Sequence, residues 1–321
     1  MSPDTEKQLT DTHVRRYAQR DLNGSHISGN RNTLQKEGGS MKTGFIGAGR
    51  AGCSLGKYLA DHGVELVGYY DKNDAAAKEA AEFTKTAFYH DMRKLVEDSE
   101  TIFITTVDAQ IVPVWEQIKR LPLKNQIICH CSGALSSDSF SGTENMEVSC
   151  CSVHPMLPFS SRFSSYEQLN HAFFTVEGQK RAVECVTDLF TSFGNEVCRI
   201  DAKEKPKYHA AASMLSNQVV AVLDSGYRLL EECGFTREKA VQATAGLVRG
   251  NVENVISQGC SSALTGPVER NDVETIKKHL ACLDEDTAEL YRVLAKHLVR
   301  IAQKKNETVD YSDLLKLLDV K

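Results

Sequence analysis

The sequence predicts an α/β protein in which a doubly wound, mostly parallel sheet is followed by an all-helical C-terminal domain. Three observations support this prediction: a glycine-rich turn after the first apolar segment, alternating apolar strands and amphipathic helices up to residue 201, and long helical segments from residue 206 onward. Such alternation is typical of a parallel sheet covered by helices on both faces. The expected domains are residues 41–201 and 206–321, and residues 1–40 are expected to be a disordered tail or an upstream extension.

The expected strands are short and apolar. They cover residues 43–46, 65–70, 87–89, 101–105, 126–131, 147–153, 172–176 and 196–200. Helices are expected between them, for example over 73–83 and 179–193, and then without further strands over 208–233, 236–258, 268–283, 284–304 and 311–320. The first helix of this last group carries an apolar face made of Val219, Val222, Leu223, Leu229 and Leu230.

The glycine-rich turn has the spacing G-x-G-x-x-G and stands between an apolar strand and a helix-like segment, which is the pattern of a dinucleotide-binding turn. The first glycine of such a turn allows a tight bend, the second lets the backbone approach a pyrophosphate, and the third lets helix and strand pack closely. The diphosphate then lies at the helix N-terminus, which favours an anion. The sequence therefore predicts a Rossmann-type NAD(P) site formed by Gly47, Ala48, Gly49, Arg50, Ala51 and Gly52.

The choice between NAD and NADP depends on the end of the second expected strand. Asp71 lies there, 22 residues beyond Gly49, where an acid can bond the ribose 2′-hydroxyl and repel a 2′-phosphate. Lys72 follows it and could pair with that phosphate. The strand-end position of Asp71 favours NAD. After the fourth strand, a turn expected to pass over the cofactor contains Thr105, Thr106 and Val107.

Composition excludes several classes of protein. The formal net charge of −5 shows no basic surplus for nucleic acid, and no apolar run approaches the ~18 residues of a membrane helix. The ten cysteines, without a signal peptide, indicate reduced thiols in the cytoplasm. No metal is expected, because no closed zinc pattern is matched by the spacing of Cys129, Cys131, Cys150, Cys151 and His154.

Two loops after expected strands contain candidate catalytic residues. His154 follows the sixth strand and is the best candidate to move a proton, because histidine titrates near neutrality. Ser132 follows the fifth strand and could share that proton or orient the substrate. The alternative for His154 is a buried histidine that bonds a backbone carbonyl beside two loop prolines.

Polar residues in the helical domain are further candidates. His209, Ser213 and Asn217 are four residues apart, so they share one helix face, where they would contact substrate or else form interhelical bonds. Arg270 could grip a substrate carboxylate bidentately, with Asp272 near a helix N-terminus; a surface cap is the alternative.

The chain resembles one known family over residues 41 to about 285. The resemblance rests on the glycine turn, His130-Cys-Ser-Gly133, His154-Pro-Met-Leu-Pro-Phe159, Tyr208-His-Ala-Ala-Ala212 with Ser216-Asn217, and Gly266-Pro-Val-Glu-Arg-Asn-Asp272. These motifs are similar to those of Rossmann proteins with a C-terminal domain of unknown function, DUF2520, which are described as NADP oxidoreductases or as similar to F420-dependent NADP reductase. More distant similarity extends to pyrroline-5-carboxylate reductase, 3-hydroxyisobutyrate dehydrogenase and prephenate dehydrogenase.

The resemblance implies roles for individual residues. Prephenate dehydrogenases have a serine and a His-Pro loop at comparable places, which implies catalytic or substrate-binding roles for Ser132 and His154. Hydroxyacid dehydrogenases use a lysine and an asparagine on the first helix after the sheet; here Ser213 and Asn217 have that spacing and the lysine is missing. Asn271 replaces an expected glycine, and Asp71 replaces the small residue, followed by arginine, that suits NADP.

Together these features predict a cytoplasmic NAD(P)-dependent oxidoreductase that transfers a hydride to or from a small carbonyl or imino acid. Its catalytic residues would be His154, Ser132, Asn217 and His209, and its substrate-binding residues Ser213 and Arg270. The alternatives are a non-catalytic NAD(P) sensor and hydride transfer to a deazaflavin. The long apolar helices predict a homodimer.

Overall fold

The computed structural model describes residues 41–319, so the predictions for residues 1–40 and for the last residues of the chain lie outside the described part. The described strands form one sheet. They are β1 (Thr43–Ile46), β2 (Leu66–Tyr70), β3 (Ala87–Phe88), β4 (Thr101–Ile104), β5 (Ile127–His130), β6 (Ser149–Pro155), β7 (Phe174–Gly178) and β8 (Val197–Arg199). Their order in the sheet is β3-β2-β1-β4-β5-β6-β7-β8.

The sheet reverses its strand order at β1, which pairs with β2 on one side and with β4 on the other. All pairs from β3 to β6 are parallel, so the carboxyl ends of these strands meet at one edge. The β7 strand runs antiparallel to β6, with Thr175 opposite His154, and β8 is parallel to β7. The predicted doubly wound, mostly parallel sheet is confirmed.

Helices cover both faces of this sheet. They are α2 (Arg50–Asp61), α3 (Asp74–Thr84), α4 (Met92–Asp98), α5 (Asp108–Ile118) and α6 (Lys180–Ser192). Alternating strand residues separate the two cores: Phe103 packs in the core with α2, α3 and α6, whereas its neighbours Ile102 and Ile104 pack in the core with α4 and α5. This alternation follows from the two-residue period of a strand.

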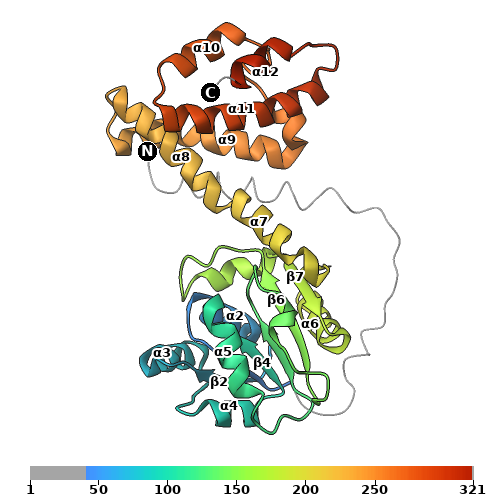
Figure 1. The fold of residues 1–321 in the computed structure, drawn as a ribbon. Helices are drawn as coiled ribbons and strands as arrows, with labels where there is room; N and C mark the ends of the chain where they lie inside the picture. The colour runs from blue at the N-terminus through green and yellow to red at the C-terminus, as the bar shows by residue number, and fades with distance from the viewer. Residues whose placement is uncertain (1–40, 320–321) are drawn as a thin grey trace, which may run out of the picture.

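The rest of the described chain is helical. It contains α7 (Lys205–Leu215), α8 (Asn217–Glu232), α9 (Arg237–Ala263), α10 (Val273–Ala281), α11 (Glu285–Lys305) and α12 (Ser312–Asp319). In Figure 1, α7 and α8 run end to end from the sheet toward the group formed by α9 to α12. The predicted all-helical C-terminal domain is therefore confirmed, and its core contains Val268, Ile276, Val299 and Tyr311.

Several helix boundaries differ from the predictions. The expected helix over 208–233 breaks at Ser216, whose φ of −121° and ψ of −75° are not helical, and the first part begins earlier, at Lys205. Pro206 fits there because the first turn of a helix needs no N–H from it. The helix expected from residue 268 begins only at Val273, since Asp272 caps it by accepting from the Thr275 backbone N–H.

Several apolar side chains of α8 and α9 are exposed to solvent. The side chains of Val220 and Leu247 are each 66% exposed, and that of Ile256 is 69% exposed. No residue of α8 is buried in this single chain. On the apolar face predicted for α8, Val219 and Val222 are 41% and 42% exposed, whereas Leu223, Leu229 and Leu230 are half-buried. In the described residues, no helix combines the length and hydropathy that a membrane crossing requires.

Candidate active site

The glycine turn leads from β1 into α2, and its three glycines differ in what surrounds them. A Cβ on Gly47, where φ is 110°, would lie 2.8 Å from the Thr105 carbonyl carbon, and a Cβ on Gly52 would overlap the Gly47 carbonyl oxygen. Packing therefore requires both glycines. A Cβ on Gly49 would meet no atom within 4 Å. The open space beside Gly49 is where a pyrophosphate would approach the backbone.

A cavity of about 510 Å³ lies beside this turn. Its lining brings together Gly47, Gly49, Arg50, Ala51, Asp71, Lys72, Thr105, Thr106 and Val107, together with Phe159 from the loop after β6. The buried hydroxyl of Thr106 has no hydrogen-bond partner in the described part of the chain. A buried polar atom without a partner is costly, so a bound polar ligand would satisfy it. These residues fit a dinucleotide.

Asp71 stands at the end of β2 with both carboxylate oxygens in use. The backbone N–H of Ala48 donates to Oδ2 at 2.8 Å, and that of Asn73 donates to Oδ1 at 2.9 Å. The carboxylate therefore lies against the glycine turn, in the cavity that contains Lys72. A bond from Asp71 to a ribose hydroxyl stays a prediction.

His154 lies near the end of β6, at the carboxyl edge of the sheet. Its Nδ1 is 2.7 Å from the hydroxyl of Tyr208, the fourth residue of α7. Burial lowers the pKa of His154 to about 4, and the charge of Lys205 acts in the same direction, as do His209 and His130. The imidazole is therefore neutral at pH 7.

His209 approaches the same place from α7. A Cβ on Gly133 would lie 2.7 Å from His209 Nδ1 and 2.9 Å from His154 Nε2. Both ring nitrogens thus meet over a backbone position that has no side chain. The structure brings these two predicted residues to the same place, and a side chain at residue 133 would require at least one of the rings to move.

Ser132 holds the turn in front of the histidines. Its hydroxyl oxygen accepts from the backbone N–H groups of Ala134 and Leu135, at 3.1 and 2.9 Å. Its role toward substrate stays a prediction. The preceding His130 is fully buried, and its Nε2 lies 3.1 Å from the Ser136 carbonyl oxygen, so this ring supports the loop.

Lys205 and Tyr208 contribute to the site, and our sequence analysis missed both. The Lys205 ammonium is fully buried and donates to the Ser132 carbonyl and the Ser152 hydroxyl. A signal for Lys205 was present, because it extends the four-residue spacing of His209 and Ser213 back by one turn. Tyr208 begins one of the motifs that carry the family resemblance, but no role was assigned to it.

Three predicted residues lie away from this cluster. Ser213 and Asn217 follow along α7 and α8, where Asn217 is exposed and accepts a hydrogen bond from Ser216. Arg270 is exposed in the turn before α10. Within the described residues, no hydrogen bond links Ser213, Asn217 or Arg270 to the sheet. Their substrate contacts stay predictions.

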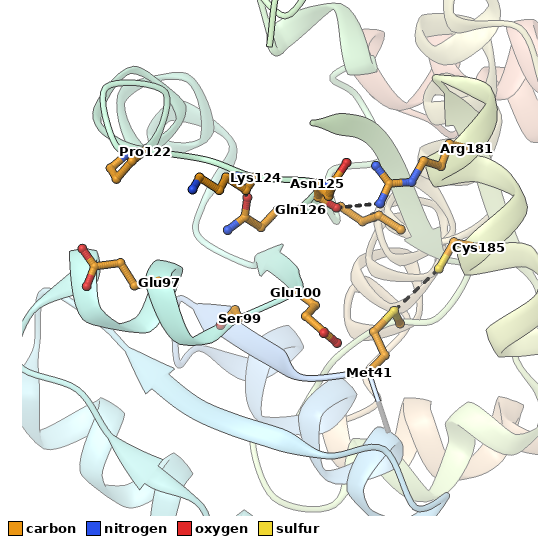
Figure 2. A pocket seen from close by; sticks show the side chains of 11 residues that line it. Met41, Glu97, Ser99, Glu100, Pro122, Lys124, Asn125, Gln126, Arg181 and Cys185 are labelled. Carbon is orange, nitrogen blue, oxygen red and sulfur yellow. Dashed lines mark hydrogen bonds between the residues drawn. The ribbon is translucent and has the colours of Figure 1, made fainter. Parts of the chain in front are cut away.

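A second cavity, of about 760 Å³, lies at the opposite edge of the sheet. Figure 2 shows its lining, in which Glu100 and Gln126 directly precede β4 and β5, and Arg181 donates to the Asn125 carbonyl at 2.6 Å. Ligands of doubly wound sheets bind at the carboxyl ends of strands, so this cavity does not form the dinucleotide site. Among residues 41–319, no three potential metal ligands gather into a site.

Comparison with family models accounts for both parts of the chain. Residues 41–125 match the oxidoreductase family with an NAD-binding Rossmann fold. Residues 172–298 match the domain of unknown function DUF2520. Residues 41–125 are thus similar to NAD-binding Rossmann domains, and residues 172–298 are similar to DUF2520 domains. This confirms the resemblance found in the motifs, and the DUF2520 match begins before β7 and extends into α11. No curated protein matches the chain.

Solved structures share this combination of a Rossmann domain and a helical domain. BF3122 from Bacteroides fragilis, a provisionally assigned NADP oxidoreductase, has a TM-score of 0.66 at 19% identity, covering 81% of this chain and 98% of its own. Protein TM1727 from Thermotoga maritima has a TM-score of 0.64 at 23% identity, covering 82% and 99%. A pyrroline-5-carboxylate reductase from Coxiella burnetii has a TM-score of 0.57 at 14% identity, covering 85% and 100%. At these identities the similarity concerns the fold, which is that of NAD(P)-binding oxidoreductases.

Proposed function

We propose that this chain is an NAD(P)-dependent oxidoreductase that transfers a hydride to or from a small carbonyl or imino acid. The observation that carries the proposal is the position of His154, a half-buried, neutral imidazole at the same sheet edge as the glycine turn. The nicotinamide ring supplies or accepts the hydride when the cofactor is bound. Reduction at carbon then requires a proton on the attached oxygen or nitrogen, and His154 is available to move it.

The contact with Tyr208 lets His154 either donate or accept a proton. A tyrosine hydroxyl both donates and accepts, so His154 Nδ1 can be bonded in either neutral tautomer. In one tautomer Nε2–H donates to a carbonyl or imine, and in the other Nε2 accepts a proton from an alcohol or amine. His209 is close enough to bond the same substrate atom or its neighbour.

NAD is the cofactor that the described residues favour. Asp71 places a negative charge at the end of β2, against the amide of Ala48, and a 2′-phosphate there would be repelled. Lys72 and Arg50 line the same cavity and would attract a phosphate instead. Because both effects act in one place, separate titrations of NADH and NADPH decide between them.

We infer that the helical domain pairs with a second copy as a homodimer. The exposed apolar side chains on α8 and α9 support this inference, since Val220, Leu247 and Ile256 would be covered in such a pair. A second copy could also bring Ser213, Asn217 and Arg270 toward a substrate pocket. In the single chain, His209 is exposed to solvent on the side where such a pocket would form.

The experiment has two stages. NADH and NADPH are first titrated separately, and oxo and imino acids are then screened for cofactor oxidation by the wild-type protein. Oxidation with at least one such acid supports the proposal. Tight cofactor binding without turnover would favour the alternative of a non-catalytic NAD(P) sensor. Cofactor oxidation that occurs only with a deazaflavin would favour the alternative of hydride transfer to a deazaflavin.

A further inference from the structure

The ammonium of Lys205 is buried without a carboxylate partner. Its side chain is 0% exposed, and Nζ donates to two neutral acceptors, the Ser132 carbonyl at 2.8 Å and the Ser152 hydroxyl at 2.7 Å. No ion pair within the described part of the chain includes Lys205. Burial of an ammonium is unfavourable unless hydrogen bonds or opposite charges compensate for the lost water. Charges buried in this way are often retained where they tune a functional site.

Lys205 shares one face of α7 with the residues that meet His154. Tyr208 and His209 follow it by three and four residues, which places all three side chains on the same side of the helix. The Lys205 Nζ lies 5.7 Å from the centre of the Tyr208 ring. The Tyr208 hydroxyl then contacts His154 Nδ1. A continuous set of contacts therefore runs from Lys205 to the imidazole.

Resting on the proposed function, we propose that Lys205 is a positioning residue: it docks α7 onto the loop after β5 and keeps His154 uncharged for proton transfer. Its two hydrogen bonds reach the carbonyl of Ser132 and the side chain of Ser152, so they join α7 to the loop after β5 and to β6. Its positive charge disfavours a second positive charge on the nearby imidazole.

The charges around His154 agree with this role. The groups that face it are Lys205, Tyr208 and His209 from α7, and His130 from β5; after burial, Lys205 is the largest charge effect that lowers its pKa. Lys205 itself has its pKa lowered by burial, while the carboxylates of Glu177 and Asp108 oppose this effect. Removing the ammonium should therefore raise the pKa of His154.

The direct test is an NMR titration of the His154 imidazole, assigned with His154→Asn and performed without substrate or cofactor. In Lys205→Met, which keeps the chain length but removes the charge, we expect the His154 titration to move upward by about one pH unit. Lys205→Arg keeps the charge and should restore the low value. Once a substrate is found, the acid limb of kcat/KM should move upward with it, while the affinity for NADH stays unchanged.

A folded Lys205→Met protein with an unchanged His154 titration would overturn the proposal. If this variant does not fold, Ser152→Asp replaces the Nζ acceptor by a carboxylate that cancels the charge, and it should give the same upward movement. No movement in Ser152→Asp would overturn the proposal equally. The NMR result is independent of turnover, so failure of this inference and failure of the oxidoreductase proposal are distinguishable.

Discussion

The Tyr208 hydroxyl lies 2.7 Å from Nδ1 of His154, so the first helix after the sheet bonds directly to the histidine at the sheet edge. The histidine cluster therefore combines residues of the sheet domain with residues of the first C-terminal helix. The strands and loops supply His154 and Gly133, and α7 supplies Tyr208, His209 and Lys205. Changes in the helix are therefore expected to alter the chemistry of the histidine.

We expect His154→Asn to lower kcat by ~10²- to 10⁴-fold, because asparagine keeps a polar side chain but cannot exchange a proton. The affinity for NADH should hardly change, since the glycine turn is untouched. Steady-state kinetics and a cofactor titration measure both quantities. Tyr208→Phe serves as the matched variant and should cause a smaller loss. Full turnover in a folded His154→Asn protein would return this histidine to a structural role.

Gly49→Val is expected to abolish dinucleotide binding while the fold survives. The valine side chain would enter the open space beside Gly49, where no protein atom lies within 4 Å. Gly52→Ala is the contrasting variant, because its Cβ would overlap the Gly47 carbonyl oxygen and overpacking costs about 1–3 kcal/mol of stability. Calorimetric titration and thermal unfolding separate the two effects. Unchanged NADH affinity in folded Gly49→Val would refute the dinucleotide site.

Asp71→Ser should improve the affinity for NADPH relative to NADH, roughly tenfold, which corresponds to about 1.4 kcal/mol of removed repulsion. Asp71→Asn is the isosteric companion, since it keeps one oxygen for the Ala48 amide. Fluorescence titration of both reduced cofactors gives the ratio. A preference that moves toward NADH would mean that Asp71 does not lie at the ribose.

Acid should destabilise the sheet domain through two of its histidines. Burial lowers the pKa of both His130 and His154 from 6.5 to about 4, so the unfolded chain binds protons first as the pH falls. Their contribution is fully present above pH 6.5 and is lost progressively toward pH 4. Denaturant unfolding between these values should show falling stability, and His154→Asn should flatten the slope. A slope identical to that of wild type would contradict the expected coupling.

We expect the protein to sediment as a dimer at micromolar concentration, because α8 and α9 expose apolar side chains that a second copy would cover. Val220→Glu or Leu247→Glu should yield monomers, since a charge would be buried in the interface. Val309→Glu, at a 40% exposed valine before α12, is the control and should leave the dimer intact. A wild-type monomer in sedimentation analysis would be the contrary result.

Local patterns in the sequence were sufficient to predict the fold. The glycine turn, the apolar strands and the alternating helices each depend on neighbouring residues, and the structure confirms the sheet they predict. The antiparallel direction of β7 had no such signal, because strand direction depends on the long loop after Pro155. The break at Ser216 was also missed, since helix periodicity continues across it.

The candidate site was harder to predict because it depends on contacts between distant segments. His154 and His209 were chosen for their chemistry, and the structure brings them together over Gly133. Lys205 was missed because a lysine beside a proline suggests a solvated boundary, whereas here the ammonium is buried against Ser132. The substrate contact predicted for Arg270 rested on the ability of a guanidinium to grip a carboxylate bidentately, and in the structure Arg270 is exposed in the turn before α10.

Transfer of deuterium from cofactor to product tests the central claim most directly. The wild-type protein is incubated with a panel of oxo and imino acids and with NADH or NADPH deuterated at the nicotinamide C4 position. The masses of the products are then measured by mass spectrometry. The account predicts a product with deuterium on the reduced carbon, formed by wild type, slowed in His154→Asn and absent with Gly49→Val. A protein that binds the deuterated cofactor at the glycine turn yet transfers no deuterium to any of these acids would contradict it.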